Sequence, residues 1–452
     1  MVSPTETSPP QDIPPTTAPA TWPTHPQIEA RETINFFVLV THQIVFRVGW
    51  MFKTESVIIP AFLDTVAGAG WLRGCLPILC RLAQSVPPVF MADRIHALRR
   101  KKLALAVCAL LMSIPFGVLA ATCWATHDRY PAWMVALFLS LYFSFFCIGG
   151  IYQLSFGTLQ GKLIRTTRRG RLLLTSTFWG TIPSIGVAVW LMPGWIGSQP
   201  PAYGHIFGFV SICFFISGLI VFLCLEPADK KWTDGSKAGA AVAEVMQALR
   251  DDANLRRLVA VVMLAGSGLL VFPHYQALAS ERLGLTGGHL VVWVVVQSAS
   301  VGLLSILVGY LADFRGNRLT LQLSIVATSI APALAIVLAQ LEPTWGAKLF
   351  WTVFIAMGVT PLVLRTVVNY TLEICDPPQH ARYLSTVALC GGIPFLFSPL
   401  VGWLVDVVGF ETVFAVTVCL ILISACVSLR LDEPRHRIGL DESPVIGLGT
   451  DE

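Results

Sequence analysis

The chain has 452 residues, of which 54% are apolar and only 13% are charged, and its mean hydropathy is +0.68. A soluble protein of this length needs about a quarter of its residues charged to cover its surface, so this composition excludes an ordinary soluble protein and predicts one embedded in a lipid bilayer. The eleven cysteines are scattered singly, without the spacing of a zinc site, so the sequence predicts no metal site, disulfide framework or cofactor.

The first part of the chain predicts a tail followed by six membrane spans. Residues 1–30 hold eight prolines and almost no large apolar residue, so we expect residues 1–33 to be a disordered cytosolic tail. A six-helix half is predicted at residues 34–226. Its apolar segments are long enough to cross a hydrocarbon core of about 30 Å and lie at 36–63, 71–92, 104–124, 132–156, 172–194 and 206–225.

A polar interruption separates this half from a second one. The cytosolic linker, residues 227–256, carries Val242, Val245, Met246 and Leu249 at helical spacing, which favours an amphipathic surface helix. A second six-helix half is predicted at residues 257–430, and residues 431–452 read as a polar cytosolic tail. The spans of this half lie at 258–280, 289–312, 319–340, 347–371, 383–405 and 411–429.

The basic residues orient these spans. Loops and tails on the side of the termini hold 23 lysines and arginines, and the opposite loops hold four. Such an excess marks the cytosolic side, so both termini are predicted in the cytosol of a protein of the plasma (inner) membrane. The same distribution explains the net charge of +4 without a nucleic-acid partner.

The two halves repeat each other at their cytosolic loops. The second span ends in MADRIHALRRKK and the eighth in GYLADFRGNR, which places Asp93 and Asp313 220 residues apart. The fourth span runs into GKLIRTTRRGR and the tenth into LEICDPPQHAR. A third copy of the pattern follows the eleventh span, with Gly402, Asp406 and Gly409 predicted at the outer face. Nested repeats of this kind are typical of one large class of transporters.

On these loops the chain resembles the major facilitator superfamily, over about residues 34–430. Gly309, Asp313, Gly316 and Arg318 match the family's signature loop between its eighth and ninth spans. The first-half loops keep part of the pattern, in Asp93, Arg94, Arg169, Gly170 and Arg171, but Val89 and His96 stand where the family usually has glycine. The resemblance implies an all-α membrane protein with twelve helices in two pseudo-symmetric six-helix bundles that rock about a central site. It also implies that Asp93 and Asp313 help to latch the cytosolic side.

The chemistry of these loops agrees with that expectation. Glycine at a helix end permits a tight turn and a close approach of two helices. A carboxylate at the same place can meet the N-terminus of a neighbouring helix or an arginine.

Four basic residues fall inside predicted spans: Arg47, Lys53, Arg81 and Arg365. Each would cost about 2.5–3.5 kcal/mol if it faced lipid near the middle of the bilayer, so they are expected to face a wet cavity or a partner. Their excess over Glu55, the only carboxylate well inside a span, favours a positively charged cavity that holds an organic anion. Structural ion pairs, or side chains that reach out to the membrane interface, remain the alternatives.

Other polar residues in the spans are weaker candidates for the cavity wall, because each can equally form a hydrogen bond between helices. The residues that we expect at the cavity are His42, Tyr152, Gln153 and Gln297, and further candidates are His274, Tyr275, Gln276, Asn369 and Tyr370. Proton coupling through Glu55 is one hypothesis, with His42 and His274 as other proton carriers and uniport or sodium coupling as alternatives.

The sequence therefore predicts a secondary active transporter that moves a small solute by alternating access, as a monomer in a lipid bilayer. Neutral solutes such as sugars or drug-like molecules are alternatives to an anion. A membrane enzyme is disfavoured because no cluster of histidines or aspartates lies at a membrane face. A sensor or scaffold on a transporter fold is the other alternative, although tails of this length leave little room for an output domain.

Overall fold

The computed structural model describes residues 26–127, 129–228, 241–375 and 379–433, and these are helical throughout, without a strand. The helices of the first half are α1 (Pro26–Phe52), α2 (Ile58–Val66), α3 (Gly70–Ala97), α4 (Lys101–Ala125), α5 (Trp133–Leu163), α6 (Thr166–Ile196) and α7 (Tyr203–Val221). Those that follow are α8 (Ala241–Asp251), α9 (Ala253–Ala265), α10 (Ser267–Leu270), α11 (His274–Leu283), α12 (Gly288–Arg315), α13 (Asn317–Thr328), α14 (Ile330–Gln340), α15 (Pro343–Leu349), α16 (Trp351–Met357), α17 (Thr360–Glu373), α18 (His380–Gly392), the 3-10 helix η3 (Ile393–Phe397), α19 (Ser398–Val408) and α20 (Phe410–Ser428).

Most of these helices combine into membrane spans. Within the described residues, eleven helical segments are long and apolar enough to cross a bilayer. Helix α3 has 28 residues and packs against α5 and α19, so it runs through the bundle as a twelfth span although its charged residues lower its hydropathy. Large apolar side chains such as Trp190 and Leu303 are 80% and 70% exposed. A surface of this kind is covered by lipid rather than by water.

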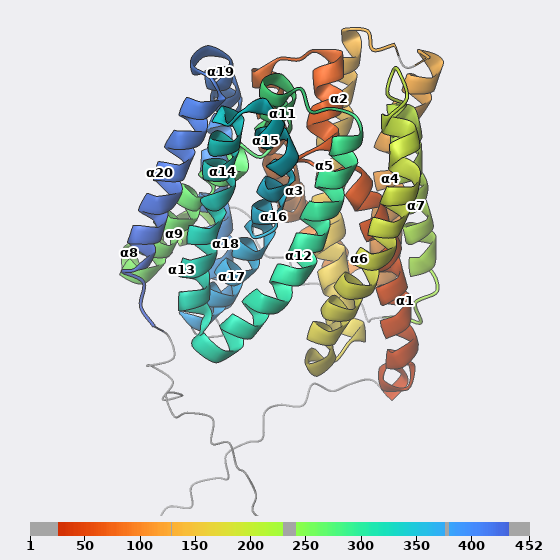
Figure 1. Cartoon of the computed structure of the whole chain (residues 1–452). Coiled ribbons are helices and arrows are strands. Elements are labelled where there is room, and N and C mark those ends of the chain that lie inside the picture. The colour runs from red at the N-terminus through yellow and green to blue at the C-terminus, as the bar shows by residue number, and fades with distance from the viewer. Residues whose placement is uncertain (1–25, 128, 229–240, 376–378, 434–452) are drawn as a thin grey trace, which may run out of the picture.

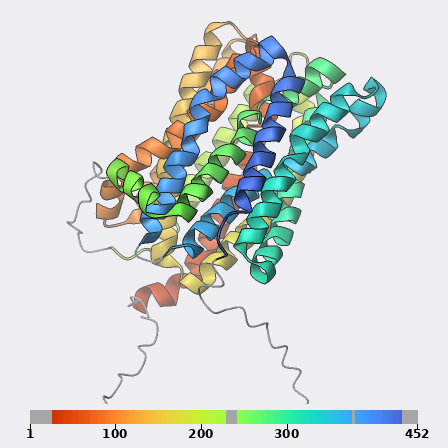
Figure 2. The same cartoon turned by 90° about the vertical axis from the view of Figure 1, so that its left-hand side faces the viewer.

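The two halves pack against each other at one end of the molecule, which we call the closed end. It is formed by α2, the start of α3, α11 and the end of α19 (Figure 1). The opposite, open end is where α1 begins and α20 ends, and the view turned by 90° shows the same arrangement (Figure 2). Because the described chain starts and finishes at the same end, it crosses the bundle an even number of times.

The closed end is sealed by glycines and by a buried arginine. A Cβ atom on Gly402 would collide with the carbonyl oxygen of Gly70 and lie 3.0 Å from the Cα atom of Gly74, so α3 and α19 touch backbone to backbone. The Asp406 carboxylate accepts hydrogen bonds from the Gly70 amide at 3.0 and 2.9 Å, at the N-terminus of α3. The Arg73 guanidinium, 2% exposed, lies 2.6 Å from Asp64, 3.6 Å from Glu281 and 4.0 Å from Asp406.

The first span is not the continuous helix expected over residues 36–63. It ends as α1 at Phe52 and resumes as α2 at Ile58. Pro60 has no N–H and its ring excludes a helical carbonyl four residues earlier, which favours a restart of the helix near this point. Thr54 caps the restart: its hydroxyl accepts from the Ile58 amide at 3.3 Å and its carbonyl accepts from the Ile59 amide at 3.0 Å.

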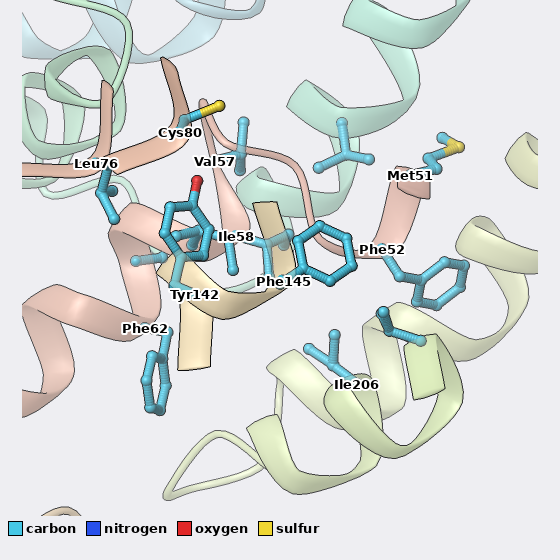
Figure 3. Close-up of a cluster of buried hydrophobic side chains, with 14 of the residues drawn as sticks. Met51, Phe52, Val57, Ile58, Phe62, Leu76, Cys80, Tyr142, Phe145 and Ile206 are labelled. Atoms are coloured by element: carbon cyan, nitrogen blue, oxygen red, sulfur yellow. The ribbon is translucent and has the colours of Figure 1, made fainter. Parts of the chain in front are cut away.

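Apolar packing fixes both sides of this break. Figure 3 shows Met51 and Phe52 at the end of α1, and Val57 and Ile58 at the start of α2, within one cluster of buried side chains. The seventh span is interrupted in a similar way, between α10 and α11, beside Pro273. The first and seventh spans therefore both expose non-helical backbone inside the bundle.

At the open end of each half, an asparagine in the first membrane helix bonds the segment that follows the last helix. The Asn35 side chain donates to the Leu225 carbonyl at 3.2 Å and accepts from the Leu225 amide at 2.8 Å. In the second half, the Asn254 side chain accepts from the Asp432 amide at 3.0 Å. We call these two contacts the asparagine clasps. They give the two halves matching closures and support the repeat seen in the sequence.

The predicted boundaries differ from the structure at two places. Helix α1 begins at Pro26, inside the predicted tail of residues 1–33, and α9 begins at Ala253, inside the predicted linker. Helix α8 lies in the segment where a surface helix was expected, with Val245 buried and Met246 half exposed. The rest of the two tails, residues 1–25 and 434–452, and linker residues 229–240 lie outside the described residues.

Candidate functional site

A cavity of about 740 Å³ lies between the two halves, next to the closed end. Its walls come from α1, α3, α5, α6, α12 and α17, and from the breaks in the first and seventh spans. Ser56, at the first break, donates a hydrogen bond to Gln297 on α12 at 2.6 Å, and both residues are buried. By contrast, Gln153 and Arg365 on the cavity wall are exposed. Solvent therefore reaches the cavity from the open end.

Helix α1 places Arg47 on the cavity wall. Gln43, Arg47 and Trp50 follow one another at spacings of four and three residues, so they share one face of the helix. The Arg47 guanidinium donates to the Thr177 hydroxyl on α6 at 3.1 Å. Its stem packs against Gly180, where a Cβ atom would lie 2.8 Å from the Arg47 Cδ atom. These contacts orient the guanidinium without neutralising it.

Two further arginines reach the same cavity. The Arg81 guanidinium, on α3, lies 4.9 Å from the centre of the Phe395 ring in η3, and this contact positions it by a cation–π interaction. Arg365, on α17, is exposed to the cavity from the second half. It therefore shares the cavity with Arg47, a second positive charge that comes from the first half.

Lys53 does not line the cavity, because the helix ends one residue before it. The residue is fully buried, and its Nζ atom lies 3.3 Å from the centre of the Trp50 ring and 4.5 Å from that of Phe146. The same atom donates to a Glu55 carboxylate oxygen at 2.9 Å. Glu55 is partly exposed and does line the cavity. The continuous helix expected over residues 36–63 is interrupted at this point, and Glu55 is paired with Lys53.

His42 also lies behind the cavity wall. Its Nδ1 atom is 2.8 Å from the Ser217 carbonyl oxygen on α7, and its Nε2 atom is 2.8 Å from the Tyr152 hydroxyl. A carbonyl only accepts, so the neutral imidazole carries its hydrogen on Nδ1 and Nε2 accepts from Tyr152. The Tyr152 hydroxyl in turn accepts from Gln43 at 2.8 Å. Tyr152 lines the cavity, and His42 fixes the direction of its hydroxyl hydrogen.

The remaining candidates fall outside the cavity wall. His274, Tyr275 and Gln276 are buried in α11 and do not belong to the lining residues. Tyr370 donates to the Asp432 carbonyl at 2.7 Å, next to the second asparagine clasp, and Asn369 is exposed outside the lining. The wall instead contains aromatic residues that sequence reasoning missed. Of these, Trp50 follows Gln43 and Arg47 at helical spacing, and that spacing was a usable signal.

The signature loops keep part of their predicted geometry. Gly316 and Gly409 have φ values of 89° and 86°, which side chains disfavour, so glycine is required at both helix ends. Arg318 donates to the Leu429 carbonyl at 3.0 Å, and Arg169 donates to the Gly161 carbonyl at 2.7 Å.

The remaining residues of the signature loops are two glycines, two arginines and the two predicted latch residues. Gly309 lies within α12 with no neighbour where its Cβ atom would be. The side chains of Arg94 and Arg171 are exposed. Gly170 lies within α6, and the side chains of Asp93 and Asp313, the two predicted latch residues, lie outside the described part of the structure.

Comparison with known proteins identifies the fold. Residues 260–445 match the family model described as Major Facilitator Superfamily. A variant of the nucleoside transporter NupG has a similar structure, with a TM-score of 0.65 and 15% identity over 89% of this chain and 100% of that one. The chain has the major facilitator fold. No curated protein matches it in sequence.

A second solved structure supports the same assignment. It is a bacterial homologue of the human lysosomal transporter Spinster, described as inward-facing and unoccupied, with a TM-score of 0.61 and 14% identity over 91% of this chain and 99% of that one. The resemblance to the major facilitator superfamily and the multi-pass helical architecture are thereby confirmed. Identities this low establish the fold and leave the substrate to be argued from the cavity.

Proposed function

We propose that this protein carries organic anions across a membrane by alternating access, and that the cavity is the binding site. The observation that carries the proposal is the charge of the cavity wall. Arg47, Arg81 and Arg365 line it, and among the lining residues Glu55 supplies the carboxylate, which Lys53 already engages. Three guanidinium groups therefore face the solvent-filled space without a carboxylate of their own, and anionic solutes are the partners that they favour.

The cavity also fits an apolar portion of such a solute. Phe46, Trp50, Phe156 and Phe272 contribute aromatic surface to the wall. A volume of about 740 Å³ lies within the range of small-molecule sites. An aromatic or aliphatic carboxylate or phosphate ester combines both features, since its charged group can meet the guanidinium forks while its body packs on the rings.

The excess of basic residues assigns the open end to the cytosol. The first turns of α4 and α6, at the open end, hold Lys101, Lys102 and Arg168. We propose this orientation, and we also propose that the protein lies in the plasma membrane and functions as a monomer. In it, the cavity of the present structure faces the cytosol and the closed end faces outward.

Glu55 has a different role in this proposal from the proton carrier considered from sequence. Protonation of Glu55 would leave the fully buried Lys53 ammonium without its carboxylate, and an unpaired buried charge is costly. We therefore propose that Glu55 serves as the counter-ion that keeps Lys53 from adding a fourth positive charge to the cavity.

Replacing any one of the three arginines by glutamine is expected to weaken anion binding about tenfold, equivalent to about 1.4 kcal/mol for the loss of a charge-assisted contact. Binding is measured as the thermal shift of the purified protein with four probes of similar shape: benzyl alcohol, benzylamine, benzoate and phthalate. We expect stabilisation by benzoate and phthalate, and loss of that stabilisation in Arg47→Gln, Arg81→Gln and Arg365→Gln. Arg47→Lys should recover part of it, because lysine keeps the charge without the planar fork.

The matched control is Arg129→Gln, because Arg129 is exposed in the loop before α5 and does not line the cavity. It should behave as the parent protein. Stabilisation by benzyl alcohol, or by a nucleoside such as uridine, without any response to the anions would replace the anion proposal. That outcome would favour a neutral solute, for which the glutamines on the wall, Gln43, Gln84, Gln153 and Gln297, offer hydrogen bonds.

A further inference from the structure

The three cavity arginines belong to both moving halves. Arg47 and Arg81 come from α1 and α3 in the first half, and Arg365 comes from α17 in the second. Because Arg47 and Arg365 line the same cavity from opposite halves, their positive charges repel each other in the present conformation. Water reaches these groups, since Arg365 is exposed and Arg47 and Arg81 are partly exposed. The open state therefore tolerates them because solvent screens their charges.

Closing the open end changes both conditions. Alternating access requires the halves to approach each other around the cavity, which brings Arg365 nearer to Arg47 and Arg81 and removes water from all three. Like charges that approach in a drier environment repel more strongly, and each unpaired guanidinium also loses hydration. An anion bound between them reverses both effects, because it pairs with the arginines of the two halves and replaces their water.

We propose that the protein is an obligatory exchanger, whose cavity crosses the membrane only when an anion occupies it. This inference rests on the proposed anion site and adds the mode of transport to it. It also specifies the preferred substrate. An anion with two negative charges can neutralise more than one of the three arginines, so dianions should exchange faster than monoanions of the same size.

The test uses the full-length protein in liposomes with radiolabelled phthalate as the dianion and radiolabelled benzoate as the monoanion. Uptake is measured into vesicles loaded with the same unlabelled anion and into vesicles that hold only an impermeant buffer. Valinomycin and equal potassium on both sides hold the membrane potential at zero, so that charge accumulation does not limit net uptake. We expect the initial rate of phthalate uptake to be at least tenfold higher in loaded vesicles, and benzoate to exchange more slowly.

The exchange mode makes its most specific prediction for Arg365→Gln. This substitution removes the second-half charge, so the empty cavity should close more readily. The ratio of loaded to empty uptake should then fall to about twofold or less, even where the affinity for phthalate is reduced. Arg129→Gln should keep the parent ratio. The ratio compares two measurements on the same variant, so reduced expression does not change it.

Two results overturn the inference in different ways. Equal uptake into loaded and empty vesicles by the parent protein would show that the empty cavity moves freely, which refutes exchange and leaves the anion site standing. If phthalate and benzoate neither stabilise the protein nor enter vesicles of either kind, the proposed anion site fails, and the exchange mode fails with it.

Discussion

Replacing Gly402 by valine is expected to prevent the closed end from forming and to reduce transport at least a hundredfold. A Cβ atom at this position would meet the Gly70 carbonyl oxygen and the Gly74 Cα atom, and neither backbone atom can turn aside as a side chain would. Helices α3 and α19 would have to separate at their crossing, which also breaks the contact of Asp406 with the Gly70 amide. The variant should therefore favour a state in which the closed end is open.

Cys80 offers a direct readout of that state. It lies on the cavity wall in α3, so a membrane-impermeant thiol reagent reaches it only from a side that is open. The experiment uses a background that lacks the other cysteines, with the reagent added from the closed-end side. The parent should be modified slowly, and the labelling rate of Gly402→Val should be at least tenfold higher. Unchanged labelling together with normal transport would contradict the proposed seal. Gly186→Val is the matched control, because no atom lies within 4 Å of a Cβ atom on Gly186.

Replacing Glu55 by glutamine is expected to destabilise the protein by about 3 kcal/mol, the lower end of the range for breaking a buried ion pair. The two partners of this ion pair differ in how deeply they are buried. Lys53 is fully buried and would lose its carboxylate, whereas Glu55 is 30% exposed and can be hydrated when Lys53 is replaced. Lys53→Met should therefore cost less than Glu55→Gln, and the double variant should recover most of the loss because it removes both charges together. Thermal melting of the purified protein measures this order.

The double variant Lys53→Met/Glu55→Gln also decides the role of Glu55 in coupling. Glu55→Gln alone is ambiguous, since it removes a titratable group and strands a buried cation at the same time. If Glu55 only balances Lys53, a pH gradient should drive no more anion accumulation in the parent than in the double variant. A gradient-driven accumulation that the parent shows and the stable double variant lacks would instead establish Glu55 as a proton carrier.

Much of the fold could be predicted because the bilayer imposes it through composition and length. The long apolar segments, the repeated loops and the basic residues at the helix ends are local properties, and each survives in the structure. Gly402, Asp406 and Gly409 show this best: the repeat placed them together at a helix end, and Asp406 meets the N-terminus of α3 as a carboxylate in that position should. The signal there was the motif itself.

The site was less predictable where side chains depend on contacts from other helices. Arg47, Arg81 and Arg365 lie on the cavity wall, because an arginine inside a span needs water, and their role in binding stays a prediction. Lys53 is also charged inside a span, but Glu55 and the Trp50 ring stabilise its charge instead of water. Extrapolating a regular helix past Phe52 hid that difference. Pro60 and the capping Thr54 were the sequence signals that the helix restarts.

The asparagine clasps have a mechanical consequence. Because Asn35 and Asn254 bond the segment after the final helix of each half to its first membrane helix, each half resists opening between its first and last helices. Deformation is then concentrated where the halves meet, along the contacts of α3 with α19 and of α6 with α12. The glycine contact between α3 and α19 is then the point about which the two halves turn.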